Sequence, residues 1–480
     1  MNLKNSYLEL GDQFYEKISP SPVSDPNLFL WNQNLALELG LPEGLTDDTQ
    51  ALSQYFSGNK LFPDSTPIAL AYTGHQFGHF NPRLGDGRAH LLGEVEAKGT
   101  SWDIQLKGSG PTMFSRRGDG RCALGPAVRE FIMSEAIHAL GVPTTRALAV
   151  VTTGDPVVRE GVKPGAVVTR VAASHLRVGT FEYFAAQQDL AAVESLCHYA
   201  ADRHFPELKL LSGSEFYKAF FTTVMRKQIE LICQWMRVGF IHGVMNTDNT
   251  AISGETIDYG PCAMMNAYSP NTVFSSIDTQ GRYRFGHQPQ IGQWNMARLA
   301  ESLMPLFDED STQARDIAQS LLNAYAPEFQ EKYFAMMGSK IGLSSVDTGD
   351  ETLINDLLEI MRKSAMDYTQ TFHLLTESQN SSGSDLPSNL SHWKQRWHSR
   401  LAKQEPEEAY KLMRSQNPVV IPRNHHMEAI IESCVIDGST AEAEAFLRVL
   451  KSPYLELDTT KHYQDPPADG DRHYQTFCGT

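Results

Sequence analysis

The stretch that decides the fold is Gly239-Phe-Ile-His-Gly-Val-Met-Asn-Thr-Asp-Asn-Thr-Ala-Ile-Ser-Gly-Glu-Thr-Ile-Asp-Tyr-Gly-Pro-Cys262. Within it, Asp248, Asn249 and Asp258 place side-chain oxygens on two short segments that are joined by a turn at Ser253-Gly254. Mg²⁺ prefers oxygen ligands and is usually held by one or two protein groups together with substrate phosphates. The stretch therefore predicts a site for a divalent cation and a nucleotide, with Asn249 and Asp258 as the metal ligands.

The spacing in this stretch is that of a protein-kinase catalytic loop, with one exception. Asn249 lies seven residues after His242, and Asp258-Tyr259-Gly260 follows where a kinase has Asp-Phe-Gly. A kinase keeps its catalytic Asp two residues after the His, but this chain has Val244 there. Valine can neither accept a proton nor orient a hydroxyl group. We expect a kinase-like metal site that uses a different base.

Two glycine-rich turns precede this stretch and are candidates for binding phosphates. Gly85-Asp86-Gly87-Arg88 leads towards a predicted strand that ends at Lys107, and the second turn, 115–121, contains Asp119 and Gly120. Glycines let backbone amides approach a phosphate, and Arg and Lys add charge. Taken alone, the first turn is better explained as a plain hairpin. Its position upstream of a strand lysine favours the phosphate-binding interpretation.

A helix predicted over 125–140 supplies a partner for that lysine. Glu130 and Glu135 both lie on it, and the sequence leaves open which of them pairs with Lys107 or whether either is simply solvated. Arg170 ends a predicted strand and Arg177 follows seven residues later. Their importance depends on whether the fold brings them into the same pocket.

Composition limits the classes of function. The chain has 480 residues, with 41 Lys plus Arg against 57 Asp plus Glu and a net charge of −16, so a nucleic-acid partner is not expected. The N-terminus lacks the pattern of a signal or transit peptide, and no segment is long and apolar enough for a membrane span. We expect no membrane partner and a cytoplasmic location. The six cysteines show no Cys-x-x-Cys spacing, which disfavours a zinc site or a disulfide framework.

The predicted architecture is an α+β, bilobal, protein-kinase-like fold with additions at both ends. Residues 1–70 contain many prolines and are expected to form an irregular wrapping extension with one helix near 30–39. We assign 71–205 to an N-lobe with the glycine-rich turn and strand lysine, and 206–380 to a C-lobe with the metal loop. Residues 381–480 are expected to form a C-terminal helical region with a mobile tail from about 455.

The chain resembles the selenoprotein O family, which consists of protein adenylyltransferases with a pseudokinase fold. The resemblance runs over nearly all of the chain and is carried by long motifs, which are 74–78 (GHQFG), 84–89 (LGDGRA), 106–108 (LKG), 117–121 (RGDGR), 242–249 (HGVMNTDN), 257–261 (IDYGP) and 280–283 (QGRY).

The resemblance implies a function and a set of site residues. The implied reaction transfers AMP from ATP to Ser, Thr or Tyr hydroxyls of protein substrates, releases pyrophosphate and depends on Mg²⁺ or Mn²⁺. Asp248 would be the catalytic base, with Asn249 and Asp258 as metal ligands. The implied nucleotide site comprises Gly85, Gly87, Arg88, Lys107, Asp119, Gly120, Arg170, Arg177 and Asp258, with Glu130 as the candidate ion-pair partner.

One departure from the family pattern concerns redox control. Family members can carry a cysteine or selenocysteine third from the end, and Cys478 occupies that place. Some relatives pair it with a cysteine before the Gln-Gly-Arg-Tyr motif, but 271–275 contains none here. A redox role for Cys478, with Cys262 as an alternative partner, stays a hypothesis.

Two other functions also stay open. The protein could transfer the γ-phosphate of ATP as a kinase does, or it could be a non-catalytic nucleotide-binding scaffold.

Overall fold

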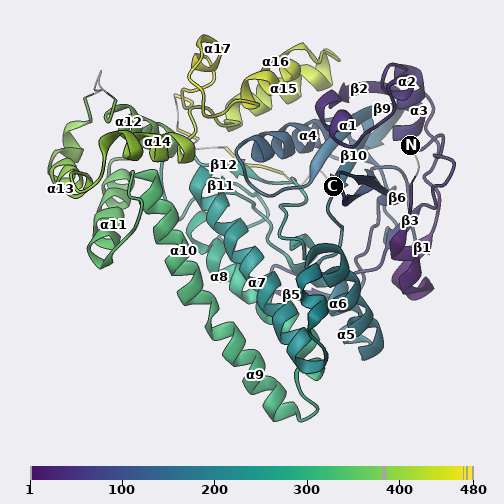
Figure 1. Cartoon of the computed structure of the whole chain (residues 1–480). Helices are drawn as coiled ribbons and strands as arrows, with labels where there is room; N and C mark the ends of the chain where they lie inside the picture. Colours follow the sequence, from purple (N-terminus) through teal and green to yellow (C-terminus); the bar gives the residue numbers. More distant parts are fainter. Residues whose placement is uncertain (1–2, 381–384, 469, 472–473, 478–480) are drawn as a thin grey trace.

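The computed structural model describes residues 3–380, 385–468, 470–471 and 474–477. It is a mixed α and β structure in which the strands gather in one half of the molecule and a large group of helices fills the other (Figure 1). Cys478 lies outside the described residues. Within the described residues, no helix is long and apolar enough to cross a membrane.

The main sheet is antiparallel throughout, in the order β1-β3-β6-β7-β10-β9-β2, and β8 pairs with β10. Its strands are β1 (Tyr15–Lys17), β2 (Asn27–Trp31), β3 (Ile68–Leu70), β6 (Ala89–Ala97), β7 (Thr100–Lys107), β8 (Cys122–Ala123), β9 (Arg146–Val158) and β10 (Val162–Ala172). Two short hairpins complete the strands, β4 (Gly74–Gln76) with β5 (His79–Asn81) and β11 (Phe240–Ile241) with β12 (Ala263–Met264).

The register of the sheet brings two predicted site residues together. Lys107 lies opposite Val168, and Arg170 lies opposite Gln105. Side chains alternate between the two faces of a strand, so Lys107 and Arg170 project from the same face as diagonal neighbours. The predicted strands ending at Lys107 and Arg170 are therefore confirmed as elements, and their pairing is what joins these two cations.

The N-terminal segment is more regular than its prolines suggested. Strands β1 and β2 form the two edges of the main sheet, and α3 (Thr49–Ser57) packs against β9 and β10. Phe56 and Phe62 are buried in a cluster with sheet residues such as Val151. The helix expected near 30–39 is confirmed as α1 (Gln33–Glu38), and the strands were not predicted. Short extended runs between prolines can pair at the edge of a sheet.

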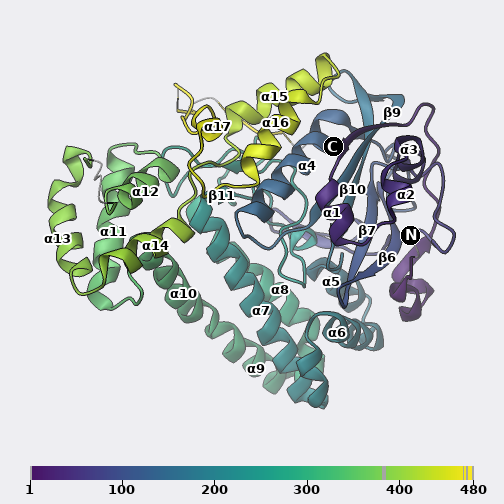
Figure 2. The same cartoon turned by 45° about the horizontal axis from the view of Figure 1, so that its top comes forward.

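The helical half is built on α7, the helix that leads into the central stretch. It runs from Gly213–Val238 and packs against α8 and α10 (Figures 1 and 2). The remaining helices are α1 (Gln33–Glu38), α2 (Glu43–Thr46), α4 (Leu124–Ala139), α5 (Val178–Ala186), α6 (Leu190–His204), α8 (Gln288–Phe307), α9 (Ser311–Asn323), α10 (Tyr325–Lys340), α11 (Thr348–Lys363), α12 (Tyr368–Glu377), α13 (Ser391–Leu401), α14 (Pro406–Gln416), α15 (Asn424–Ile436), α16 (Ala441–Leu450) and α17 (Asp458–Lys461).

Helix α4 is held between the sheet and the C-terminal region. Its inner side packs on β9 and β10, and α15 and α16 cover it from outside. The apolar spacing that predicted this helix is explained by these contacts, since Phe131, Ile132 and Ala136 are all buried. The C-terminal region therefore supports the helix that carries Glu130.

The described part of the tail after residue 455 is mostly exposed, with two buried threonines, and its mobility stays a prediction. Thr460 and Thr476 are buried. The Thr476 hydroxyl donates to the carbonyl of Pro261 at 2.7 Å, and its backbone N–H donates to Phe274 at 2.8 Å. Polar composition favoured a solvated segment, but these side chains and backbone groups find partners on the loop that follows Asp258.

Candidate active site

A cavity of about 470 Å³ is lined by residues of the glycine-rich turns, the sheet and the central stretch. It is lined by all of the residues that the sequence assigned to nucleotide, metal and base, which are Gly85, Gly87, Arg88, Lys107, Asp119, Gly120, Arg170, Arg177, Asp248, Asn249 and Asp258. The cavity wall carries seven cationic side chains (Arg88, Lys107, Arg116, Arg121, Arg159, Arg170 and Arg177) and four carboxylates (Asp86, Asp119, Asp248 and Asp258). A chain of net charge −16 thus contains a locally basic cavity.

A cluster of four charged groups lies at one wall of this cavity, and three of them, Lys107, Arg170 and Asp258, line it. The ammonium group of Lys107 lies 2.7 Å from Glu130 and 2.6 Å from Asp258. Arg170 bridges the same two carboxylates, with an ion pair to Glu130 and 2.7 Å between its Nη2 and Asp258. Of the two helix carboxylates, Glu130 is therefore the partner of Lys107, while Glu135 pairs with Arg146 at 2.7 Å.

The cations of this cluster keep both carboxylates ionised. Burial alone would raise the pKa of Asp258, but Lys107, Arg170 and Arg88 outweigh it and hold the pKa well below its usual range. Burial opposes ionisation of Glu130 in the same way, and Arg170 and Lys107 lower its pKa. The four charges sum to zero, so the cluster is internally neutralised.

Asp258 also has an unusual backbone. Its φ is +68°, a left-handed conformation that non-glycine residues rarely adopt. Strain of this kind costs about 1–3 kcal/mol and persists only where surrounding contacts impose it. The two ion pairs of the carboxylate supply such contacts, so the backbone and the side chain of Asp258 are fixed together.

The first glycine-rich turn packs so closely that it excludes side chains. Gly85 has φ +73°, and a Cβ at this position would lie 2.3 Å from the ring of Phe114. A Cβ on Gly87 would lie 2.8 Å from the carbonyl oxygen of Phe114. The glycines therefore allow the turn to lie against 112–115, the loop that precedes the second turn. In that second turn, Asp119 is held by Arg159 at 2.8 Å, and this hydrogen bond lowers the pKa of Asp119.

Arg177 connects the turn with the central stretch. Its guanidinium lies 3.6 Å from the Asp86 carboxylate and 4.3 Å from the ring centroid of Tyr72. Its Nη1 donates to the backbone carbonyl of Asp248 at 3.1 Å. Arg177 is 4% exposed, so a cation is fixed beside the Asp248 segment.

Asp248 is the least satisfied carboxylate of the cavity. Gln76 donates to its Oδ2 at 3.2 Å, whereas Oδ1 is buried without a hydrogen-bond partner among the described residues. Burial raises the pKa of Asp248 to about 6, although Arg177 opposes this shift. Asp248 lines the cavity, and a carboxylate with a raised pKa and one oxygen without a partner has the properties of a general base.

Asn249 and Asp258 fit the chemistry of a divalent-cation site. Asn249 donates its amide N–H to the carbonyl of Val244 at 3.1 Å, and this contact reserves its side-chain oxygen as an acceptor. Asp258 contributes a carboxylate with a lowered pKa to the same cavity. One amide oxygen and one carboxylate leave the remaining positions of a hard cation to phosphates and water.

His242 has a structural role. It is 1% exposed, and its Nε2 lies 2.9 Å from the carbonyl of Ile257. This contact ties the segment that carries Asp248 to the segment that carries Asp258.

Several cavity residues were missed by residue-by-residue reasoning. Tyr72, Gln76, Asp86, Arg116 and Asn246 line the cavity without having been assigned a role. Gln76, Asp86 and Asn246 lie in motifs that carried the family resemblance, so motif membership was the available signal. Only the folded chain shows that Gln76 contacts Asp248, because the two residues are 172 positions apart.

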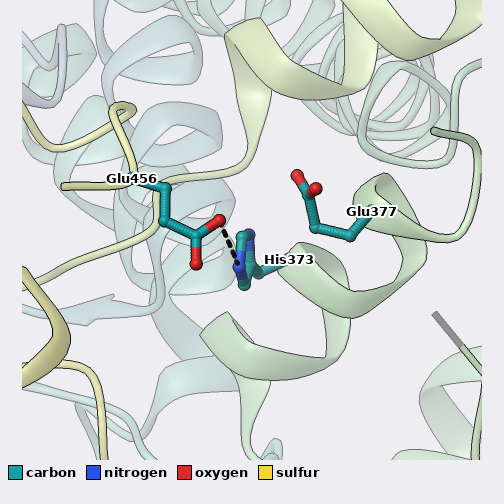
Figure 3. A group of neighbouring side chains, drawn as sticks. All are labelled: His373, Glu377 and Glu456. Atoms are coloured by element: carbon teal, nitrogen blue, oxygen red, sulfur yellow. Dashed lines mark ion pairs between the residues drawn. The ribbon is translucent and has the colours of Figure 1, made fainter. Parts of the chain in front are cut away.

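A second group of potential metal ligands lies in the C-terminal region. His373 and Glu377 project from α12, and Glu456 comes from the segment after α16 (Figure 3). Their ligand atoms lie within 4.8 Å of one another, whereas adjacent ligands of a tetrahedral zinc ion are about 3.3–3.5 Å apart. Glu377 already faces Arg414 at 3.6 Å, and His373 faces Glu456 at 3.9 Å. We interpret the group as structural contacts, in which Glu377 pairs with Arg414 of α14 and His373 approaches Glu456.

Comparisons with known proteins identify the family. A family model described as "Protein adenylyltransferase SelO" matches residues 1–451. The chain is 58% identical to "Protein nucleotidyltransferase YdiU" of Teredinibacter turnerae, with 100% of both chains covered. It is 50% identical to the proteins of the same name from Pseudoalteromonas translucida (100% of both chains) and Bacillus thuringiensis (100% of this chain and 98% of the relative). The chain therefore belongs to the SelO family of protein adenylyltransferases.

Proposed function

We propose that this protein transfers AMP from ATP to Ser, Thr or Tyr hydroxyls of other proteins and releases pyrophosphate. The observation that carries the proposal is the composition of one cavity. It contains a surplus of cations for a triphosphate and a base candidate at Asp248, while Val244 lines it where a kinase would have its base. The family to which the chain belongs supports the same reaction.

We propose in addition that the architecture is a bilobal kinase-like fold with the segments 71–205 and 206–380 as its two lobes. The support is the arrangement of Lys107 on an antiparallel strand, Glu130 on the helix that packs on the sheet, and Asp258 on the segment between β11 and β12. In this proposal, residues 1–70 complete the sheet, and residues 381–480 brace α4.

The chemical step assigns a role to each charged group. The acceptor oxygen attacks the α-phosphorus of ATP, and the bond from this phosphorus to the oxygen that bridges to the β-phosphate breaks. The hydroxyl proton passes to Asp248, and the negative charge that develops on pyrophosphate is stabilised by Lys107, Arg170 and Arg177. Mg²⁺ or Mn²⁺, held by Asn249 and Asp258, would neutralise further phosphate charge.

One experiment distinguishes this reaction from the two alternatives. The protein is incubated with Mg²⁺ or Mn²⁺, a mixture of candidate acceptor proteins and ATP labelled at either the α- or the γ-phosphate. Covalent α-label is expected. Covalent γ-label would identify a kinase, and absence of both labels would favour a nucleotide-binding scaffold. Asp248→Ala should abolish α-label transfer while it retains ATP binding, and Asp316→Ala on the exposed side of α9 is the matched control.

A further inference from the structure

The Gln280-Gly281-Arg282-Tyr283 motif has no role in the site as described so far. Tyr283 is buried, and its hydroxyl donates to Asn246 at 2.6 Å and accepts the backbone N–H of Phe77 at 3.0 Å. Asn246 and Phe77 both line the cavity. Tyr283 therefore anchors the motif to the cavity wall, and this anchoring fixes the position of the preceding residue, Arg282.

Arg282 is held in a defined place by an aromatic side chain. Its guanidinium lies 4.8 Å from the ring centroid of Trp294 on α8, and Arg298 lies 4.9 Å from the same ring. Stacking on Trp fixes the plane of a guanidinium and leaves its N–H groups free to bind an anion. A Cβ on Gly78 would lie 3.4 Å from the Arg282 guanidinium carbon, so the β4–β5 hairpin borders the same group.

Three carboxylates around Arg298 and the backbone of Arg282 are engaged by other groups. Arg298 pairs with Glu301 at 2.6 Å, and Glu182 lies 2.5 Å from His75. Asp278 accepts the backbone N–H groups of both Arg282 and Tyr283, at 2.8 and 2.7 Å. Among the described residues, Arg282 makes no ion pair, and its buried Nε has no hydrogen-bond partner. A partly exposed guanidinium without a counter-ion is a site for an anion from outside the chain.

The location of Arg282 indicates which anion it binds. Arg282 does not line the phosphate cavity, but its neighbours Gln76 and Phe77 do, and Gln76 contacts Asp248. It therefore borders the β4–β5 hairpin, whose Gln76 contacts the base candidate Asp248. The exposed side chains of Phe80 (43%) and Ile277 (47%) lie on the hairpin and the loop that flank it, as is usual for a surface that binds another protein.

We propose that Arg282, positioned by Trp294, binds a carboxylate close to the acceptor hydroxyl, so that this enzyme modifies acidic segments of its protein substrates. The inference rests on the proposed adenylyl transfer and adds the class of acceptor. A cation at the edge of the cavity can select substrates by charge complementarity without contacting the nucleotide.

The test uses synthetic peptides of one sequence with a single Ser, Thr or Tyr acceptor. Each of the three positions on either side carries Glu, Gln or Lys, and transfer of α-label from ATP is measured with the full-length protein. Wild type is expected to prefer Glu at one or more of these positions. Arg282→Gln should raise KM for that peptide about tenfold, the size expected for loss of one charge-assisted hydrogen bond at a partly exposed site, and leave KM for ATP unchanged.

Charge reversal and a remote control make the test specific. Arg282→Glu should shift the preference from the Glu peptide to the Lys peptide. Arg315→Gln removes one charge on the exposed surface of α9, as Arg282→Gln does at its site, and should leave KM for every peptide unchanged. Equal KM values of wild type for the Glu and Gln peptides, or an equal loss for all peptides in Arg282→Gln, would overturn the inference.

A binding measurement separates this inference from the proposed reaction. Fluorescently labelled Glu and Gln peptides are titrated in the presence of α,β-methylene ATP, which blocks cleavage at the α-phosphate. If wild type but not Arg282→Gln binds the Glu peptide more tightly than the Gln peptide, the role of Arg282 in substrate binding is supported, even if no AMP is transferred. Transfer of AMP without any charge preference in peptide binding would refute the role of Arg282 but would still support the proposed AMP transfer.

Discussion

Replacement of Asp248 by Asn should make the protein more stable while abolishing transfer. Burial of the carboxylate raises its pKa from 3.8 to about 6, so the folded state prefers the protonated form. The difference of about 2.2 pKa units corresponds to about 3 kcal/mol at about 1.4 kcal/mol per unit. Asn carries no charge and avoids this cost, although its amide needs an acceptor of its own, so a gain of about 1–3 kcal/mol is expected.

The pH dependence gives this prediction its sign. Between pH 3.8 and about 6 the folded wild type binds more protons at Asp248 than the unfolded chain does, so its stability falls as the pH rises through this window. Asp248→Asn lacks this loss. The stability difference between variant and wild type should therefore be small near pH 4, grow up to about pH 7 and then remain constant.

Urea denaturation at pH 4, 6 and 8, without nucleotide and followed by tryptophan fluorescence, measures this difference from the midpoint and slope. Asp316→Asn removes an exposed carboxylate on α9 and should shift the midpoint little at any of these pH values. An Asp248→Asn protein that is less stable than wild type at pH 8, or a difference that does not change with pH, would refute the reasoning from burial.

Three further predictions follow from the cavity. Glu130→Gln leaves Lys107 and Arg170 with one carboxylate between them and should lower the free energy of unfolding by about 3–5 kcal/mol in urea denaturation. Glu359→Gln, the control, breaks an exposed pair with Arg362 and should lower it by less than about 1 kcal/mol. Equal losses in the two variants would contradict the importance of burial. Asn249→Ala should raise the metal concentration that gives half-maximal transfer about tenfold or more, as expected for loss of one metal ligand. Binding of ATP measured without metal should stay unchanged. An unchanged metal titration would exclude Asn249 as a ligand. Gly74→Ala would place a Cβ 2.7 Å from Asp248 Oδ1 and should reduce AMP transfer about 100-fold with ATP affinity retained. Gly44→Ala, whose Cβ would meet nothing within 4 Å, should leave transfer unchanged. Full activity of Gly74→Ala would show that the base tolerates displacement.

Local patterns in the sequence predicted the elements that carry the site. The alternation that ends at Lys107 and the helical spacing around Glu130 both correspond to elements of the structure. The same local reasoning did not predict the strands within residues 1–70 or the contacts of Thr476. These features depend on partners distant in sequence, which are β3 for β1, β9 for β2 and Pro261 for Thr476.

The choice between Glu130 and Glu135 shows where local reasoning ends. The two residues are five positions apart on one helix, which is about 140° around its axis at about 100° per residue. They therefore face different neighbours, and which of them faces Lys107 depends on how α4 lies on the sheet. That orientation is set by its packing between the sheet and α15 and α16.

The sequence by itself determined the chemical groups of this protein: oxygen donors at Asn249 and Asp258, a strand lysine, a missing kinase base at Val244 and motifs long enough to indicate the family. Only the tertiary structure decided how these groups behave. The pKa of Asp248 near neutrality, the neutralised cluster around Lys107 and the uncompensated charge of Arg282 all arise from burial and from distances between segments far apart in the chain. Electrostatic free energies depend on burial and on the distances between charges, and local sequence determines neither of them.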